Sequence, residues 1–378
     1  METETFKEGS FGYDLDFLNQ WDEELVVLKK DNAQVLVSPK YQSKVFTSTV
    51  SGKDGKSMGW INYKAFGKDD PHMNAYGGEN RFWLGPEGNV FSLFFKPMTE
   101  MTFENWETPA PIDSEAWDMV NKTENSVSME KQMELKNYSN HDFVLKAKRT
   151  VTILDKDEIE NLLEIKTRGL DIVGYKTDNS ITNIGDNVWT KSTGAPCIWI
   201  LDMFPPSKKT TIVIPYRTEA EGEVATTDYF GQIPDNRVSF NEGLLYFKAD
   251  GKSRGKLGVP PKRATNMAGS YDAVDKILTI TLFDIDRHGT YLNQEWNLEA
   301  KPFSGDAINA YNDGPLDDGP QMGPFYELES VSPAALLQPG ETLGHTHSVF
   351  HFTGNEKDLN AVLESIFGIG IKDINEVF

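Results

Sequence analysis

Short segments rich in β-branched and aromatic residues recur along most of the chain, and they constrain its fold more than any other feature. Glycine-, proline- and aspartate-containing turn sequences separate them, for example at 52–55, 250–252, 313–315 and 339–340. The clearest predicted strands are 24–28, 33–38, 90–95, 143–154, 161–167, 210–215, 244–248, 277–283 and 348–353. About 20 strands at this spacing predict an all-β fold, a large antiparallel β-sandwich, rather than alternating βαβ units.

Helical signals are few. Residues 10–21 show a mixed pattern, and residues 355–367 form the stronger candidate, with Asn355 in position to cap the helix. One apolar stripe of this segment consists of Leu359, Val362, Leu363 and Ile366. We therefore expect few short helices, among them a C-terminal helix packed on the sheet.

Composition limits the organisation and the partners. The chain shows no internal repeat or linker, so we expect a disordered N-terminus over 1–10 and a single domain over 11–378. A net charge of −21 repels phosphate backbones, so nucleic acid is not an expected partner. No apolar run approaches the roughly 20 residues that a transmembrane segment needs. The lone Cys197 excludes an internal disulfide, and the oligomeric state stays open.

No signal peptide is visible at the start of the chain. A periplasmic or secreted location, with a signal already trimmed, is nevertheless slightly favoured over a cytoplasmic one.

The segment 323–354 carries two glutamates two residues apart. Because side chains alternate along a strand, Glu327 and Glu329 should share one face while Leu328 and Ser330 point the other way. Two neighbouring carboxylates do not both ionise readily, so one should have a raised pKa unless Arg81 or a cation compensates.

A second cluster, at 74–87, combines charged and aromatic residues behind a Gly-Gly step. The planar guanidinium of Arg81 is suited to binding a sugar, and a buried structural ion pair with Glu79 is the alternative. Both roles stay open for Glu79 and Glu87, and Trp83 offers a plane on which a sugar ring can stack.

Two further groups raise the question of a metal. The loop 311–324 holds Asp313, Asp317 and Asp318, where a divalent cation such as calcium could bind, although a solvated loop is favoured. His345 and His347 share a strand face, which suits zinc, but a polar stripe is favoured because spacing fixes no third ligand. We therefore predict no metal site and no cofactor.

Together these segments resemble a divergent branch of the galactose mutarotase-like (aldose 1-epimerase) superfamily. The resemblance rests on GGENRFWLGPEG (77–88), SITNIGDNVW (180–189) with the following APCIWILDMFPPS, YNDGP (311–315), and FYELESVSPA, LQPGE, HTH and FHF within 325–352. It implies a supersandwich of antiparallel sheets with a sugar cleft on the concave face. It also implies that Glu329 is the catalytic base and that Arg81 binds the sugar.

Two histidines of that family are missing here. Ile184 follows Thr182 and Asn183 where the general acid is expected, and Glu87 lies near the expected place of the second histidine. Ring opening of an aldose needs a proton donor at the ring oxygen as well as an acceptor at the anomeric hydroxyl. A carboxyl group with a raised pKa, from Glu79, Glu87 or Glu327, would have to replace the histidine.

The sequence thus predicts a carbohydrate-binding protein whose partner is a mono- or oligosaccharide. The candidate activity is that of an aldose 1-epimerase or related sugar isomerase acting at the anomeric centre. A non-catalytic sugar-binding module and a polysaccharide hydrolase or lyase are the alternatives. The candidate catalytic residues are Glu329, Glu327 and Glu87, and the candidate sugar-binding residues are Arg81, Asn80, Glu79, Trp83, Asn183, Tyr311 and Asn312.

Overall fold

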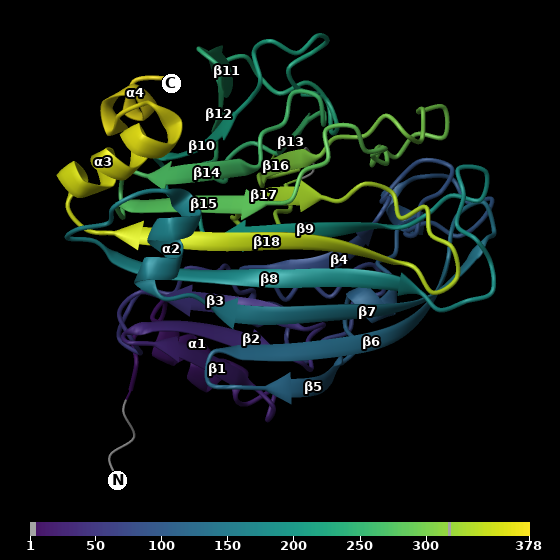
Figure 1. Cartoon of the computed structure of the whole chain (residues 1–378), viewed down its shortest axis with the longest axis horizontal. Helices are drawn as coiled ribbons and strands as arrows, with labels where there is room; N and C mark the ends of the chain where they lie inside the picture. Colours follow the sequence, from purple (N-terminus) through teal and green to yellow (C-terminus); the bar gives the residue numbers. More distant parts are fainter. Residues whose placement is uncertain (1–4, 317–318) are drawn as a thin grey trace.

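The computed structural model describes residues 5–316 and 319–378, which form three antiparallel sheets (Figure 1). Disorder is expected over residues 1–10, and the first four of these lie outside the described residues. The largest sheet has ten strands in the order β11 (Val238–Asn241), β12 (Leu244–Lys248), β10 (Thr210–Pro215), β14 (Met267–Asp272), β15 (Ile277–Phe283), β18 (Thr342–Thr353), β8 (Asp171–Asn183), β7 (Asp142–Ile153), β6 (Ser126–Lys136) and β5 (Asp118–Lys122).

The second sheet has five strands, in the order β13 (Gly255–Val259), β16 (Ile308–Asn312), β17 (Tyr326–Val331), β9 (Cys197–Phe204) and β4 (Arg81–Gly85). The third consists of β1 (Val26–Lys30), β2 (Ala33–Ser38) and β3 (Lys44–Thr49). The α-helices are α1 (Phe11–Leu18), α2 (Lys156–Leu163), α3 (Glu356–Phe367) and α4 (Ile371–Asn375). Three single 3₁₀ turns occupy Tyr63–Ala65, Phe103–Asn105 and Ala110–Ile112.

The ten- and five-stranded sheets pack face to face. Apolar side chains from both, such as Ile200 and Leu328 from the smaller sheet and Leu145 and Val349 from the larger, belong to one buried cluster. This sheet-on-sheet packing confirms the predicted all-β sandwich.

Helices cover the opposite face of the ten-stranded sheet at one end, where Figure 1 shows α2, α3 and α4. On β18, Phe350 and Phe352 pack against these helices while Val349 points into the sandwich, as strand alternation requires. The predicted C-terminal helix is confirmed as α3, and the Asn355 side chain accepts a hydrogen bond from the Asp358 backbone N–H at 3.0 Å.

Two predicted strands are wrong. Residues 161–163 instead form the end of α2, and residues 164–167 form the loop after it. The helix forms because Asp155 and Glu158 make a capping box and Ile159 and Leu163 bury one helical stripe. Residues 90–95 form turns, because the Asn89 and Ser92 side chains accept backbone N–H groups that a sheet ladder would otherwise use.

None of the helices in the described ranges has the length and apolar character that crossing a membrane requires.

Candidate functional site

Charged and aromatic side chains gather on the face of the five-stranded sheet that is turned away from the ten-stranded sheet. Ser330 fixes the orientation, because its hydroxyl lies 2.8 Å from a ring nitrogen of His347 on β18 of the larger sheet. Side chains alternate along a strand, so Glu327 and Glu329 on β17 face the other way, outward from the sandwich. The structure thus agrees with the expected alternation of Glu327 and Glu329 with Leu328 and Ser330.

Cross-strand register assembles this face from all five strands of the sheet. Glu327 lies opposite Met203 on β9 and opposite Tyr311 on β16, and Tyr311 in turn lies opposite Lys256 on β13. In a second row, Leu201 on β9 lies between Arg81 of β4 and Glu329 of β17. Residues far apart in the sequence thereby become neighbours.

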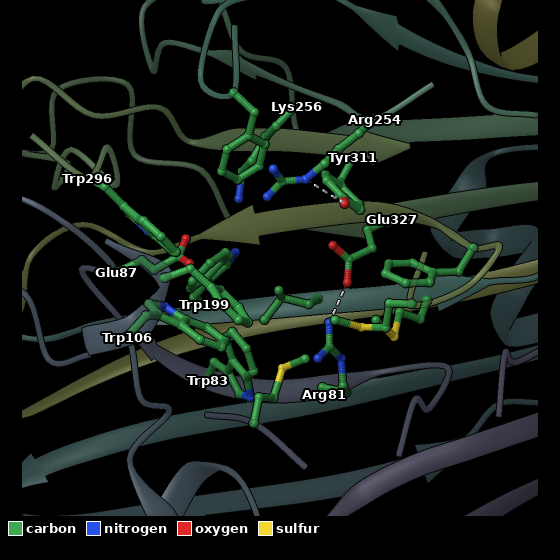
Figure 2. A pocket seen from close by; sticks show the side chains of 17 residues that line it. Arg81, Trp83, Glu87, Trp106, Trp199, Arg254, Lys256, Trp296, Tyr311 and Glu327 are labelled. Atoms are coloured by element: carbon green, nitrogen blue, oxygen red, sulfur yellow. Dashed lines mark hydrogen bonds and ion pairs between the residues drawn. The ribbon is translucent and has the colours of Figure 1, made fainter. Parts of the chain in front are cut away.

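These rows form the wall of an open pocket with an empty volume of about 680 Å³, including solvent at its mouth (Figure 2). Its aromatic lining includes Trp83, Trp106, Trp199, Trp296, Phe230 and Tyr311. Its charged lining consists of Arg81, Glu87, Arg254, Lys256 and Glu327. Aromatic planes beside a few charged groups are typical of a small-molecule site.

Glu327 forms an ion pair with Arg81 across the pocket wall (Figure 2). Both side chains are largely buried, and the Arg81 guanidinium also lies 5.0 Å from the centre of the Trp83 ring. Burial raises the pKa of Glu327 to about 8. Arg81 opposes this increase, and the neighbouring Glu329 carboxylate adds to it. Burial and Glu329 therefore favour the protonated form of Glu327 against the effect of Arg81, which makes this carboxyl group a candidate proton donor.

Glu329 lies next to the lining residues rather than among them. It is 1% exposed, accepts a hydrogen bond from the Trp199 indole N–H at 2.8 Å, and pairs with the Lys256 ammonium at 3.1 Å. Both contacts go to Oε2, and within the described ranges Oε1 has no hydrogen-bond partner. Glu329 is thus a buried carboxylate whose unpartnered oxygen is itself shielded from solvent.

Glu87 lies in the pocket near Trp296 and Trp199, on the opposite side from Arg254 and Tyr311 in the view of Figure 2. Burial raises the pKa of Glu87, and Lys256 opposes the effect. The pocket therefore contains a second carboxyl group that favours its protonated form.

The other predicted sugar-binding residues do not line this pocket. Glu79 accepts hydrogen bonds from Ser48 at 2.8 Å and from the His351 ring at 3.0 Å, inside the sandwich. Asn183 donates to the backbone oxygens of Asn187 and Leu337. These contacts give both side chains structural partners.

Asn80 and Asn312 are also placed away from the pocket. Asn80 donates to Asp202 at 2.5 Å, and Asn312 accepts from the Gly251 backbone N–H at 2.9 Å and donates to the Ser253 carbonyl at 2.8 Å. Of the predicted residues, the pocket thus brings together Arg81, Trp83, Glu87, Tyr311 and Glu327, with Glu329 in contact with its wall.

The strand histidines take part in a hydrogen-bond chain between the sheets. The Ser330 hydroxyl lies 2.8 Å from both His345 Nε2 and His347 Nδ1, and His347 Nε2 lies 2.8 Å from Asp202 Oδ2. Burial lowers the pKa of His345 to about 3, so this ring is neutral. In the described part of the chain, no group of three His, Cys, Asp or Glu side chains is arranged to hold a metal ion.

The acidic loop considered for a cation lies beside the pocket. Asp313 accepts hydrogen bonds from the Tyr311 hydroxyl at 3.2 Å and from the Gly323 backbone N–H at 2.8 Å. Asp317 and Asp318 lie outside the described residues. Asp313 therefore orients Tyr311 at the pocket wall.

Sequence reasoning missed most of the other lining residues, among them Trp106, Trp199, Trp296, Arg254 and Lys256. Trp199 belongs to a stretch that carried the resemblance, but both of its neighbours are apolar, so nothing marked its face. Arg254 and Lys256 alternate at the start of the edge strand β13, and only the sheet order brings Lys256 to Glu329.

Comparison with known proteins places the chain in a family. The model of a family of unknown function, DUF6786, matches residues 9–378. The chain belongs to this family. No curated protein matches it.

Two solved structures show the fold of this DUF6786 chain. A galactose mutarotase-like protein from Lactobacillus casei ATCC 334 superposes with a TM-score of 0.52 at 9% identity, covering 86% of this chain and 99% of that one. The Slr1438 protein from Synechocystis sp. PCC 6803 superposes with a TM-score of 0.51 at 12% identity, covering 88% and 96%. The expected galactose mutarotase-like fold is thereby confirmed.

The protonation of Glu327 can be measured directly. We expect its carboxyl carbon to titrate near pH 8 in ¹³C NMR, far above its ordinary value of 4.5, because burial and Glu329 favour the neutral form. The signal is assigned by its loss in Glu327→Gln. In Glu329→Gln the titration midpoint of Glu327 should move to lower pH, since the neighbouring negative charge is gone. A midpoint close to 4.5 in the wild-type protein would remove Glu327 as a proton donor.

Proposed function

We propose that the pocket on the five-stranded sheet binds a carbohydrate. The observation that supports this is the combination of several indole rings with paired charged groups in one open pocket. The C–H faces of a sugar ring stack on aromatic planes, while its hydroxyls bond to carboxylates and to guanidinium groups. A mono- or oligosaccharide is the ligand class that uses both features.

Replacing Trp296 tests the proposal. Trp296 is half-buried in the pocket wall and stacks on Trp106, with ring centres 6.0 Å apart. We expect Trp296→Ala to weaken sugar binding about tenfold, because a stacking plane is lost. Isothermal titration calorimetry with a panel of mono- and oligosaccharides measures the loss.

The matched control is Trp21→Ala, which removes a half-buried indole at the end of α1, away from the pocket. Equal losses in the two variants would point to a general effect on the fold. A panel in which no saccharide binds the wild-type protein would contradict the proposal.

Proton transfer at the anomeric centre is the activity that we propose for this site, as in an aldose 1-epimerase or related sugar isomerase. Glu329 would accept the proton of the anomeric hydroxyl while Glu327 or Glu87 donates a proton to the ring oxygen, so that the C1–O5 bond breaks to give the open-chain aldehyde. Rotation about C1–C2 and reversal of both transfers would give the other anomer. The raised pKa values of Glu327 and Glu87 support the acid role.

Glu79 is a weaker candidate for the acid, because its bonds to Ser48 and His351 hold it inside the sandwich. A non-catalytic binding module and a polysaccharide hydrolase or lyase are the alternatives. NMR exchange between anomers, and chromatography of polysaccharides incubated with the protein, distinguish the three.

A further inference from the structure

The pocket concentrates positive charge in an acidic protein. The chain has 58 acidic and 37 basic residues, yet three cations, Arg81, Arg254 and Lys256, line this one pocket. Arg81 is paired with Glu327, and Lys256 with Glu329. The third cation, Arg254, has no such carboxylate contact among the described residues and is the one best placed to bind an added anion.

Arg254 forms no ion pair within residues 5–316 and 319–378. Its guanidinium lies 3.9 Å from the centre of the Phe230 ring, and its Nε donates to the neutral hydroxyl of Tyr311 at 3.3 Å. Figure 2 shows the group projecting into the pocket on the same side as Lys256. Stacking and the Nε bond fix the plane of the guanidinium and leave its two terminal nitrogens for a ligand.

Neither of the two carboxyl groups that line the pocket forms an ion pair with this cation. Glu87 lies on the opposite side of the pocket in Figure 2, and although Arg254 favours its charged form, burial is the larger effect and raises its pKa. Glu327 is already in contact with Arg81, and its pKa is raised as well. An exposed guanidinium beside a second cation provides a favourable position for an anion.

We propose that the sugar bound by this pocket is acidic, and that its carboxylate binds the two terminal nitrogens of Arg254. This inference rests on the proposed sugar-binding function and specifies its substrate class as uronic acids. The planar, singly charged carboxylate matches the planar donor pair. Asp313, which accepts a hydrogen bond from the Tyr311 hydroxyl at 3.2 Å, repels any bound anion, and it disfavours a phosphate dianion more than a singly charged carboxylate.

Calorimetry with four kinds of ligand tests the inference on the full chain. The probes are D-galacturonate and D-glucuronate, their neutral methyl esters, D-galactose and D-glucose, and the 6-phosphates of these hexoses. We expect the uronates to bind about tenfold or more tightly than the esters, since only the carboxylate differs. The preference should shrink at high ionic strength.

Variants of Arg254 connect the preference to this side chain. Arg254→Gln should lower the affinity for uronates about 10- to 100-fold and remove their advantage over the methyl esters. Arg254→Lys should keep part of the preference for uronates that Arg254→Gln loses, because lysine supplies the charge without the paired donors. The matched control is Arg168→Gln, an exposed arginine in the loop between α2 and β8, which should leave the preference unchanged.

The outcomes separate the two proposals. Equal binding of a uronate and its methyl ester would overturn the acidic-sugar inference and leave sugar binding in place. Tighter binding of the hexose phosphates would overturn the assignment to a carboxylate. Failure of every sugar to bind would overturn the proposed function and this inference with it.

Discussion

Glu329→Gln is expected to slow anomer interconversion about 10²–10⁴-fold, the usual cost of losing a general base. Glutamine keeps the shape and can still accept the Trp199 hydrogen bond, but it does not take up a proton at Oε1. NMR exchange spectroscopy between the α and β anomers of the bound sugar measures the rate.

Two controls accompany this variant. Lys256 loses its anionic partner in Glu329→Gln, so urea unfolding must show that the protein remains folded. Glu124→Gln, a substitution of an exposed glutamate in the turn before β6, should keep the wild-type rate. A wild-type protein that binds sugars without accelerating their interconversion would exclude the epimerase and leave the binding module.

Asp202→Ala is expected to lower the free energy of unfolding by about 3–5 kcal/mol, because it leaves buried polar groups without their charged partner. Asp202 is fully buried between the sheets, where it accepts a hydrogen bond from Asn80 at 2.5 Å and contacts His347 at 2.8 Å. Asn80 in turn accepts a hydrogen bond from the buried Arg149. Urea unfolding followed by tryptophan fluorescence measures the change.

The matched control for this prediction is Asp178→Ala on β8. Asp178 pairs with Lys176 at 2.9 Å on the protein surface, so its loss should cost less than about 1 kcal/mol. A similarly small effect for Asp202→Ala would show that the buried chain of hydrogen bonds contributes little to stability.

Local patterns in the sequence were sufficient for the fold class and for part of the site. Turn sequences and β-branched runs predicted most of the strands, and Asn355 marked the start of α3 because its side chain accepts a hydrogen bond from a first-turn N–H group. Alternation also placed Glu327 and Glu329 on one face. The same reasoning failed for α2, whose short apolar run at 161–167 fits a strand unless the capping box at Asp155 is recognised.

Tertiary structure decided which faces are buried between sheets and which line the pocket. Arg81 reaches the pocket while the adjacent Asn80 bonds to Asp202 inside the sandwich. Lys256 reaches Glu329 only because β13, β16 and β17 are neighbours in the sheet. Strand periodicity states that two side chains share a face, but it does not state what that face contacts. That depends on the order of strands and on the packing of distant layers, which residue spacing alone does not encode.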